Sequence, residues 1–269
     1  MLFTQGRALV VGVGKYQYVP AANVAQTTND AVSLAQALTN QGGYPQNQVT
    51  LLADGSASRA ALIASLQQLA NTAQPGDIVI FFYSGHGDYA TDGSFYLTTS
   101  DTQLDGDKIK LDTGLGQSEF LTLLRAIKAR QLLIIINSCF SGKLEPSLGF
   151  NTEAAPAALG SGVPDAVTTA ALATGSGRVI ITACQESERS WVGNGNLTIF
   201  GQSLVQGING SAGLPGPFVS ANDLYNYLFK TVPPAAQQLG HQQEPVLTVL
   251  RQVGLPLLVA LNAATARSG

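Results

Sequence analysis

The sequence predicts an α/β domain with a mostly parallel sheet of about six strands and helices on both faces. Apolar runs alternate along the chain with segments of helical periodicity, the order expected of strand–helix units. Within each run the apolar residues are continuous, which is typical of parallel strands that are covered on both faces. The chain has 269 residues, 45% of them hydrophobic, and can therefore form a substantial core.

The first half of the chain contains four expected strands and three expected helices. The strands are residues 7–14, 48–54, 77–83 and 131–137. The helices are residues 28–40, 58–73 and 119–130. Thr28 or Asn29 would cap the first helix. Leu62, Leu66 and Leu69 recur at helical spacing and support the second.

The strand–helix pattern stops at residue 143 and resumes at residue 178. Residues 143–177 are rich in Ala, Gly, Pro, Ser and Thr and predict a long exposed loop, a kind of loop that is usually functional or disordered. The elements expected after it are a strand at 178–184, helices at 197–208 and 220–230, and last strands at 244–250 and 256–261.

The composition limits the classes of partner that we expect and indicates the cellular compartment. A net charge of −3 and 12% charged residues give no clustered basic face, so we expect no nucleic-acid partner. No apolar run approaches the ~20 residues of a membrane span, and the first residues lack the pattern of a signal peptide. Two Cys cannot form a disulfide framework and suit a reducing compartment, so we expect a cytoplasmic protein.

Two motifs place reactive side chains just past the ends of predicted strands. His86 lies in YSGHG after the strand at 77–83, and Cys139 lies in NSCFSG after the strand at 131–137. Ligand chemistry in parallel sheets gathers at these carboxyl ends. A Cys thiolate can attack a carbonyl carbon while a nearby imidazole moves protons, and the amides of Gly87 and Cys139 would face the developing oxyanion. Composition alone favours the alternative, a core Cys and a turn His.

Other chemical interpretations fit the residues less well. VGVGKY at 11–16 lacks the glycine and hydroxyl positions of a phosphate loop and predicts a tight turn after the first strand. No pair of Cys or His has the spacing of a zinc site, so we expect no metal site. Cys184 is expected to be an inert buried thiol, and His241 to be exposed in a Gln-rich loop.

YSGHG followed by NSCFSG resembles the caspase-like cysteine peptidases, especially metacaspases and their prokaryotic orthocaspase relatives. The likeness extends to VGVGKY, to the helix TNDAVSLAQAL, to the strand ITAC near residue 180 and to QEPVL near the end, so it covers nearly the whole chain. It implies one caspase-like catalytic domain over residues 1–269, with a large-subunit-like part (1–142), an exposed linker loop (143–177) and a small-subunit-like part (178–269). It also implies a cysteine endopeptidase in which His86 is the general acid/base and Cys139 the nucleophile.

The resemblance further implies which residues bind the substrate. Asp30 matches the acid that metacaspases place at the base of the pocket for the residue before the cut, so cleavage after Arg or Lys is expected. Asn137 stands where metacaspases usually have a second Asp, which would weaken this preference. Ser190 and Trp191 match the segment that lines the caspase cleft, but Val192 replaces the Arg that would bind an acidic side chain. The alternatives are that Asp30 is an ordinary first-turn helix acid and that Trp191 is a core residue.

The same resemblance implies how the protein is activated and which partners it has. Lys143 and Arg178 flank the loop, so self-cleavage after a basic residue would activate the protein. We expect protein or peptide substrates, a regulatory or activating protein, a monomer and no cofactor. Calcium activation remains an alternative, although the acids after the catalytic His are too sparse for a calcium cluster: Asp88, Asp92, Asp101, Asp105, Asp107 and Asp112. The rival functions are a catalytically silent scaffold or binding module and a peptidase with one protein target.

Overall fold

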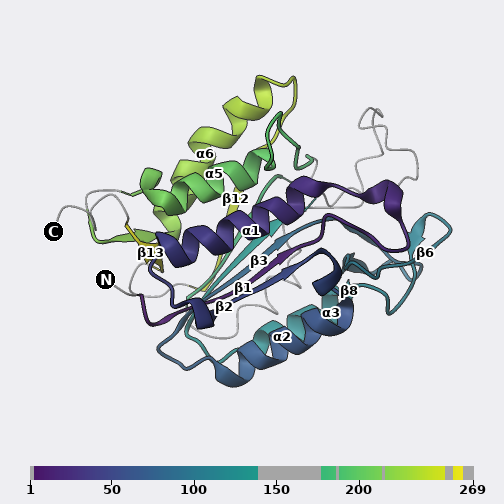
Figure 1. Cartoon of the computed structure of the whole chain (residues 1–269), viewed down its shortest axis with the longest axis horizontal. Coiled ribbons are helices and arrows are strands. Elements are labelled where there is room, and N and C mark those ends of the chain that lie inside the picture. Colours follow the sequence, from purple (N-terminus) through teal and green to yellow (C-terminus); the bar gives the residue numbers. More distant parts are fainter. Residues whose placement is uncertain (1–2, 139–176, 186–187, 214–215, 252–256, 263–269) are drawn as a thin grey trace.

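The structure is a computed structural model that describes residues 3–138, 177–185, 188–213, 216–251 and 257–262. Its central sheet has six strands in the order β12-β10-β9-β3-β1-β2 (Figure 1). These strands are β1 (Gly6–Gly12), β2 (Val49–Ala53), β3 (Ile78–Ser84), β9 (Gln131–Asn137), β10 (Arg178–Thr182) and β12 (Val246–Arg251). All neighbours pair in parallel except β10 and β12, which confirms the mostly parallel sheet.

Helices cover both faces of the sheet, as predicted (Figure 1). One face carries α1 (Ala25–Asn40), α5 (Ile199–Gln206) and α6 (Ala221–Gln237), and the other carries α2 (Arg59–Thr72) and α3 (Gln117–Arg125). Side chains of the strands alternate between two cores, so that Val10 packs with the first group of helices and Leu9 with the second. Within the described residues, no helix combines the length and the apolar character needed to cross a membrane.

The structure departs from the predicted elements mainly at their ends. α1 begins at Ala25, three residues before the expected start, and α3 ends at Arg125 instead of residue 130. Of the two expected last strands, only β12 joins the central sheet. The other, β13 (Leu258–Leu261), pairs antiparallel with β11 (Phe218–Ser220).

Several short elements were not predicted because each is too short to show a period. The strands are β4 (Gly87–Tyr89), β5 (Phe95–Leu97), β6 (Leu104–Asp105), β7 (Lys108–Ile109) and β8 (Leu115–Gly116). The helical turns are η1 (Pro20–Ala22), η2 (Gln46–Gln48), η3 (Asp54–Ser56) and η4 (Gly207–Ser211). β4 and β5 form a hairpin immediately after the His86 turn, and η1 lies just before α1.

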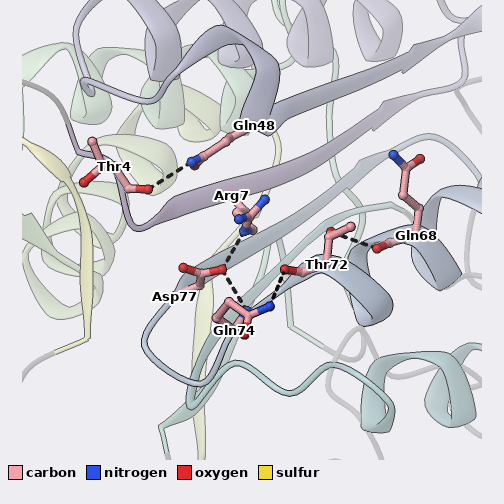
Figure 2. Close-up of polar contacts among 7 residues, drawn as sticks. All are labelled: Thr4, Arg7, Gln48, Gln68, Thr72, Gln74 and Asp77. Carbon is pink, nitrogen blue, oxygen red and sulfur yellow. Dashed lines mark hydrogen bonds and ion pairs between the residues drawn. The ribbon is translucent and has the colours of Figure 1, made fainter.

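Polar contacts secure the amino ends of the strands, away from the predicted site (Figure 2). Arg7 Nε donates to Asp77 Oδ2 at 2.5 Å, and the backbone N–H of Gln74 donates to the same oxygen at 2.8 Å. Gln48 Nε2 donates to the carbonyl oxygen of Thr4 at 3.0 Å. These contacts fix where β1 and β3 begin, and therefore the register in which both strands reach their carboxyl ends.

Arg178 is buried, which corrects its assignment as a cleavage site. It is 2% exposed and lies in β10, opposite Leu132 of β9. Its guanidinium donates to the carbonyl oxygens of Leu124 and Ile127 at 3.1 and 3.0 Å, near the end of α3. These carbonyls lie at the negative end of the helix and stabilise the buried cation. The peptide bond after Arg178 is inside the sheet, where a peptidase could not reach it.

Candidate active site

The two motif strands are neighbours in the central sheet. β3 and β9 run in parallel register, with Ser84 opposite Asn137. The N–H of Gly85 donates to the carbonyl oxygen of Asn137 at 3.1 Å, so the pairing continues one residue past β3. His86 and Cys139 each follow this last pair of strand residues by two positions. The sheet therefore directs both motifs to the same carboxyl edge.

Gly87 lies against the residue that precedes the predicted nucleophile. A Cβ atom on Gly87 would be 3.4 Å from Ser138 Oγ and 2.5 Å from the ring of Phe95, so a larger residue there would have to displace that ring. Ser138 is buried, and its Oγ has no hydrogen-bond partner among the described residues. Cys139 itself lies outside the described residues. The described geometry thus brings YSGHG to the residue immediately before Cys139.

The His86 imidazole is held in one orientation by the backbone. Nε2 lies 2.8 Å from the carbonyl oxygen of Ala22 in η1. A carbonyl only accepts hydrogen bonds, so Nε2 carries the proton and, in the neutral ring, Nδ1 is the acceptor. The backbone N–H of His86 donates to Tyr16 Oη at 3.1 Å. The carbonyl of His86 accepts from Tyr83 Oη at 2.6 Å and from Thr98 N at 3.1 Å.

Burial lowers the pKa of His86 below its usual value of 6.5, although the bond to Ala22 acts in the opposite direction. The ring is therefore mainly neutral near pH 7, with Nδ1 able to take a proton from a thiol. Tyr16, whose ring lies 5.4 Å from the imidazole, has its pKa raised by burial to about 12 and stays protonated. This arrangement can perform general acid/base chemistry at neutral pH.

Asp30 lies at the centre of a buried polar cluster, which we call the Asp30 cluster (Asp30, Ser84, Asn137 and Thr198). Oδ2 of Asp30 accepts from Ser84 Oγ at 2.9 Å, from Asn137 Nδ2 at 3.0 Å and from Thr198 Oγ1 at 2.8 Å. Oδ1 accepts from the backbone N–H of Thr198 at 3.0 Å. The carboxylate thereby joins α1, β3, β9 and the start of α5. Because α1 begins at Ala25, Asp30 is beyond the first turn, and the helix-acid alternative is wrong.

Burial raises the pKa of Asp30 from 3.8 to about 6, and its hydrogen bonds oppose this shift. The folded protein therefore holds the Asp30 proton more tightly than the unfolded chain does. The contribution of this group to stability is greatest below about pH 4 and declines as the pH rises through about 6. Near pH 7 the carboxyl group is mainly ionised, so the cluster contains a buried negative charge.

Ser190 and Gln243 extend the cluster toward the surface. Ser190, which is partly exposed, donates from Oγ to Asn137 Oδ1 at 2.5 Å. The buried amide of Gln243 accepts from the backbone N–H of Trp191 at 3.0 Å and donates to the carbonyl of Ala183 at 3.0 Å. The predicted substrate residues Asp30, Asn137 and Ser190 are thus joined by hydrogen bonds, and the next residue, Trp191, is fixed in position.

Trp191 and His241 form one wall of a cavity of about 390 Å³. Their rings stack at 3.5 Å with an angle of 2° between the planes, so His241 is a packed residue and not simply exposed in its loop. Residues 23–26, at the start of α1, and Val192 also line the cavity. The carbonyl of the preceding residue, Ala22, holds the His86 ring. The cavity therefore adjoins the His86 end of the site, and Trp191, which is partly buried and packs against the core, also lines it.

Sequence reasoning missed four contributors to this site. Nothing in the sequence marks Ala22 or Tyr16 as site residues. Every residue has a backbone carbonyl like that of Ala22, and Tyr16 belongs to a segment predicted only as a turn. Thr198 caps α5, with Oγ1 accepting from the N–H of Gly201 at 2.9 Å, and its place before an apolar run was a usable signal. Gln243 begins the QEPVL stretch that the resemblance included. Cys184 is buried, as predicted.

The acids that follow His86 do not form a metal cluster among the residues that the structure describes. Asp101 instead accepts from the backbone N–H of Arg59 at 2.8 Å at the start of α2. Asp112 is 89% exposed and lies 4.0 Å from the guanidinium of Arg59.

A family model described as the caspase domain matches residues 5–252, which is most of the chain. The chain belongs to the caspase domain family. This is a family of cysteine peptidases, so the motifs around His86 and Cys139 lie in the context that the resemblance predicted. Metacaspase-1 of Schizosaccharomyces pombe is 29% identical over 110 residues, which is 38% of this chain and 23% of that protein. Metacaspase-1 of Saccharomyces cerevisiae is 32% identical over 93 residues, or 32% of this chain and 21% of that protein.

Solved structures support the caspase fold of this domain. A protein from Geobacter sulfurreducens superposes with a TM-score of 0.61 at 20% identity, covering 95% of this chain and 96% of that one. Caspase-1 from Spodoptera frugiperda gives a TM-score of 0.57 at 16% identity, covering 96% and 93%. The alignments to the two metacaspases span less than a quarter of their length. The fold is therefore that of caspases.

Proposed function

We propose that this caspase domain is a cysteine endopeptidase that uses a His86–Cys139 dyad and cuts after Arg or Lys. The observation that carries the proposal is the parallel register of β3 and β9, which leads the His86 turn and Ser138 to one edge of the sheet. The fixed imidazole, with its lowered pKa and its Nε2 bonded to Ala22, supplies the base that such a dyad needs.

In the proposed reaction, Nδ1 of His86 takes the proton from the Cys139 thiol, and Sγ bonds to the scissile carbonyl carbon. The resulting oxyanion faces the amides of Gly87 and Cys139. The C–N bond then breaks as His86 returns the proton to the leaving amine, which leaves a thioester. Water, deprotonated by the same imidazole, attacks the thioester, and Cys139 leaves as the thiol with that proton. The reaction requires no metal ion.

The preference for Arg or Lys rests on the charge and the hydrogen-bonding groups near the dyad. The Asp30 cluster holds a buried negative charge between β3 and β9 and reaches Ser190 at its partly exposed end. A long basic side chain would gain from this potential and from hydrogen bonds, whereas Asp or Glu would be repelled. Val192 supplies no cation for an acidic residue. Trp191, with His241, offers a flat apolar wall for a neighbouring substrate side chain.

The test is cleavage of fluorogenic peptides that differ only in the residue before the cut: Arg, Lys, Asn, Asp or Ala. We expect turnover of the Arg and Lys peptides, with and without added calcium, and none by the Cys139→Ala protein. A preference for Asp would contradict the specificity but retain the dyad. No turnover of any peptide, with cleavage of one co-expressed protein, would favour the single-target peptidase. No cleavage of any kind would favour the scaffold.

Self-cleavage, if it activates the enzyme, should occur after Lys143. This is the one Lys or Arg between Cys139 and Gly177, and the bond after Arg178 is inside the sheet. We expect active protein to run as fragments 1–143 and 144–269 on denaturing gels, and Lys143→Gln to remain whole. Lys230→Gln, on the exposed side of α6, should be cut like the wild type. Full activity from an intact wild-type chain would contradict this step.

A further inference from the structure

Three buried hydroxyl groups surround the backbone of His86, and we call them the hydroxyl cluster (Tyr16, Tyr83 and Thr98). Each of the three residues is at most 3% exposed. They come from three separate segments, namely the turn after β1, the strand β3 and the residue after β5. The Thr98 oxygen lies 3.0 Å from Tyr16 Oη and 3.2 Å from Tyr83 Oη, so Thr98 connects the two tyrosines.

The hydroxyl cluster fixes the carbonyl group of His86. This oxygen accepts from Tyr83 Oη at 2.6 Å and from Thr98 Oγ1 at 2.9 Å. Gly85 makes the first of these contacts possible, because a Cβ atom at that position would be only 2.6 Å from Tyr83 Oη. The carbonyl group therefore has two hydroxyl donors and cannot turn without breaking both hydrogen bonds.

The N–H group of His86 is bound by Tyr16. It donates to Tyr16 Oη at 3.1 Å, and this oxygen is its one acceptor among the residues that the structure describes. Because an N–H group only donates, the Tyr16 oxygen uses a lone pair here and keeps its own proton. The carbonyl oxygen of Val13 at 3.2 Å and Thr98 Oγ1 at 3.0 Å are the partners for that proton.

The segment that carries Tyr16 also holds the imidazole of His86. Ala22, six residues later, supplies the carbonyl oxygen that lies 2.8 Å from Nε2. The next residue, Asn23, closes the segment on itself, since its Oδ1 accepts from the backbone N–H of Tyr16 at 2.8 Å. One closed loop therefore contacts His86 both at its backbone N–H and at its ring, and restricts the torsion angles between these two groups.

Removal of the Tyr16 hydroxyl would release one of these two contacts. The N–H of His86 would then be buried without a partner, and this cost favours a rotation of its peptide group. That peptide group follows Gly85, which has no Cβ atom to resist the rotation. A rotated peptide group would turn the Cα–Cβ bond of His86 with it and draw Nε2 away from the Ala22 carbonyl.

We propose that Tyr16 is a positioning residue for His86, an inference that rests on the peptidase function proposed above. Its hydroxyl fixes the peptide plane before His86, so that Nε2 stays on the Ala22 carbonyl and Nδ1 is left for the thiol proton. Tyr16 affects the proton transfer only through His86. It does not line the described cavity and is not part of the Asp30 cluster, so substrate binding does not depend on its hydroxyl.

Tyr16→Phe tests this, because it deletes one oxygen atom and keeps both the ring and the backbone N–H that binds Asn23. We expect kcat for the Arg peptide to fall by about 10- to 100-fold, the effect of a misplaced reacting group, with KM within about twofold of the wild type. Labelling of Cys139 by iodoacetamide at pH 7 should slow as well, because it needs the same imidazole and no substrate.

Tyr44→Phe is the matched control. Tyr44 is 2% exposed and donates from Oη to the carbonyl oxygen of Val259 at 2.6 Å, so this change also deletes one buried hydrogen bond. It lies at the amino ends of the strands, since a Cβ atom on Gly6, the first residue of β1, would be 2.6 Å from its ring. Both variants should melt a few degrees below the wild type, but only Tyr16→Phe should lose kcat and thiol labelling.

A comparison with His86→Ala tests whether Tyr16 acts through His86. In the His86→Ala protein, the further change Tyr16→Phe should not slow labelling any more, because the group that Tyr16 positions is already gone. If Tyr16→Phe does not fold, Thr98→Val takes its place with the same expectations, since it removes the hydroxyl beside Tyr16 Oη.

Three results would overturn the inference while the peptidase function stands. They are a wild-type kcat and labelling rate in Tyr16→Phe, an equal loss of kcat in Tyr44→Phe, and a further loss of labelling when Tyr16→Phe is added to His86→Ala. A wild type that cuts no peptide, together with a wild-type labelling rate in His86→Ala, would instead count against the peptidase function itself.

Discussion

Replacing His86 with Ala is expected to lower kcat/KM by about 10²–10⁴-fold, the range of general acid/base catalysis. His86 is the imidazole that the β3 turn delivers to the sheet edge, and its Nε2 is fixed by the Ala22 carbonyl. Without it, the thiol of Cys139 would lose the group that we propose takes its proton. Labelling of Cys139 by iodoacetamide at pH 7 should slow as well, and buried Cys184 should not interfere.

The chain contains its own control, because His241 is the other His. His241 stacks on Trp191 in the cavity wall, so His241→Ala should change KM with little effect on kcat. Peptide turnover and thiol labelling, measured on both variants, separate the two roles. Equal losses of kcat in the two variants, or a Cys139 labelling rate in His86→Ala equal to that of the wild type, would contradict the proposed dyad.

Gly201→Ala is expected to destabilise the fold by about 3 kcal/mol, at the upper end of typical overpacking costs. Gly201 lies in the first turn of α5, directly over the Asp30 carboxylate. An added Cβ would lie 2.0 Å from Oδ1 and 2.2 Å from Cγ, so either the helix or Asp30 must move. In an ordinary helix the same change stabilises by about 0.5–1 kcal/mol, so the sign of the effect is diagnostic. Urea unfolding at pH 7 measures it.

Gly195→Ala is the matched control, because the atom nearest to its new Cβ, Gln202 Oε1, would be 3.9 Å away. Combining Gly201→Ala with Asp30→Ala should cost less than the sum of the two single changes, since the second removes the atoms in conflict. A Gly201→Ala protein as stable as the wild type would mean that the Asp30 cluster is not packed as described.

The sequence predicted the sheet and the positions of the site motifs because both depend on long, regular patterns. Continuous apolar strands define a parallel sheet, and such a sheet places chain segments at its carboxyl edge whatever their separation. Asp30, Asn137 and Ser190 were nominated by resemblance alone, and they are joined by hydrogen bonds. Only the combination of a family motif with a fixed strand register made their meeting predictable.

The remaining features depend on contacts that no local pattern encodes. Arg178 is a predicted cleavage site because it flanks the loop 143–177, yet carbonyls near the end of α3 accept hydrogen bonds from its guanidinium. His241 is predicted to be exposed because its neighbours are Gln, but the ring of Trp191, fifty residues earlier in the chain, stacks on it. The partner of each side chain comes from a distant segment, so burial could be seen only in the folded chain.

The buried Arg178 has a consequence for any cleavage between the two halves of the chain. This side chain belongs to the later half, whereas both of its carbonyl partners, Leu124 and Ile127, belong to the earlier half. Five residue pairs join β9 to β10 across the same boundary. If the chain were cut between them, these contacts would still join the two halves. A nicked molecule would persist as a noncovalent heterodimer. The interface between its two chains would lie between β9 and β10, inside the central sheet rather than at its edge.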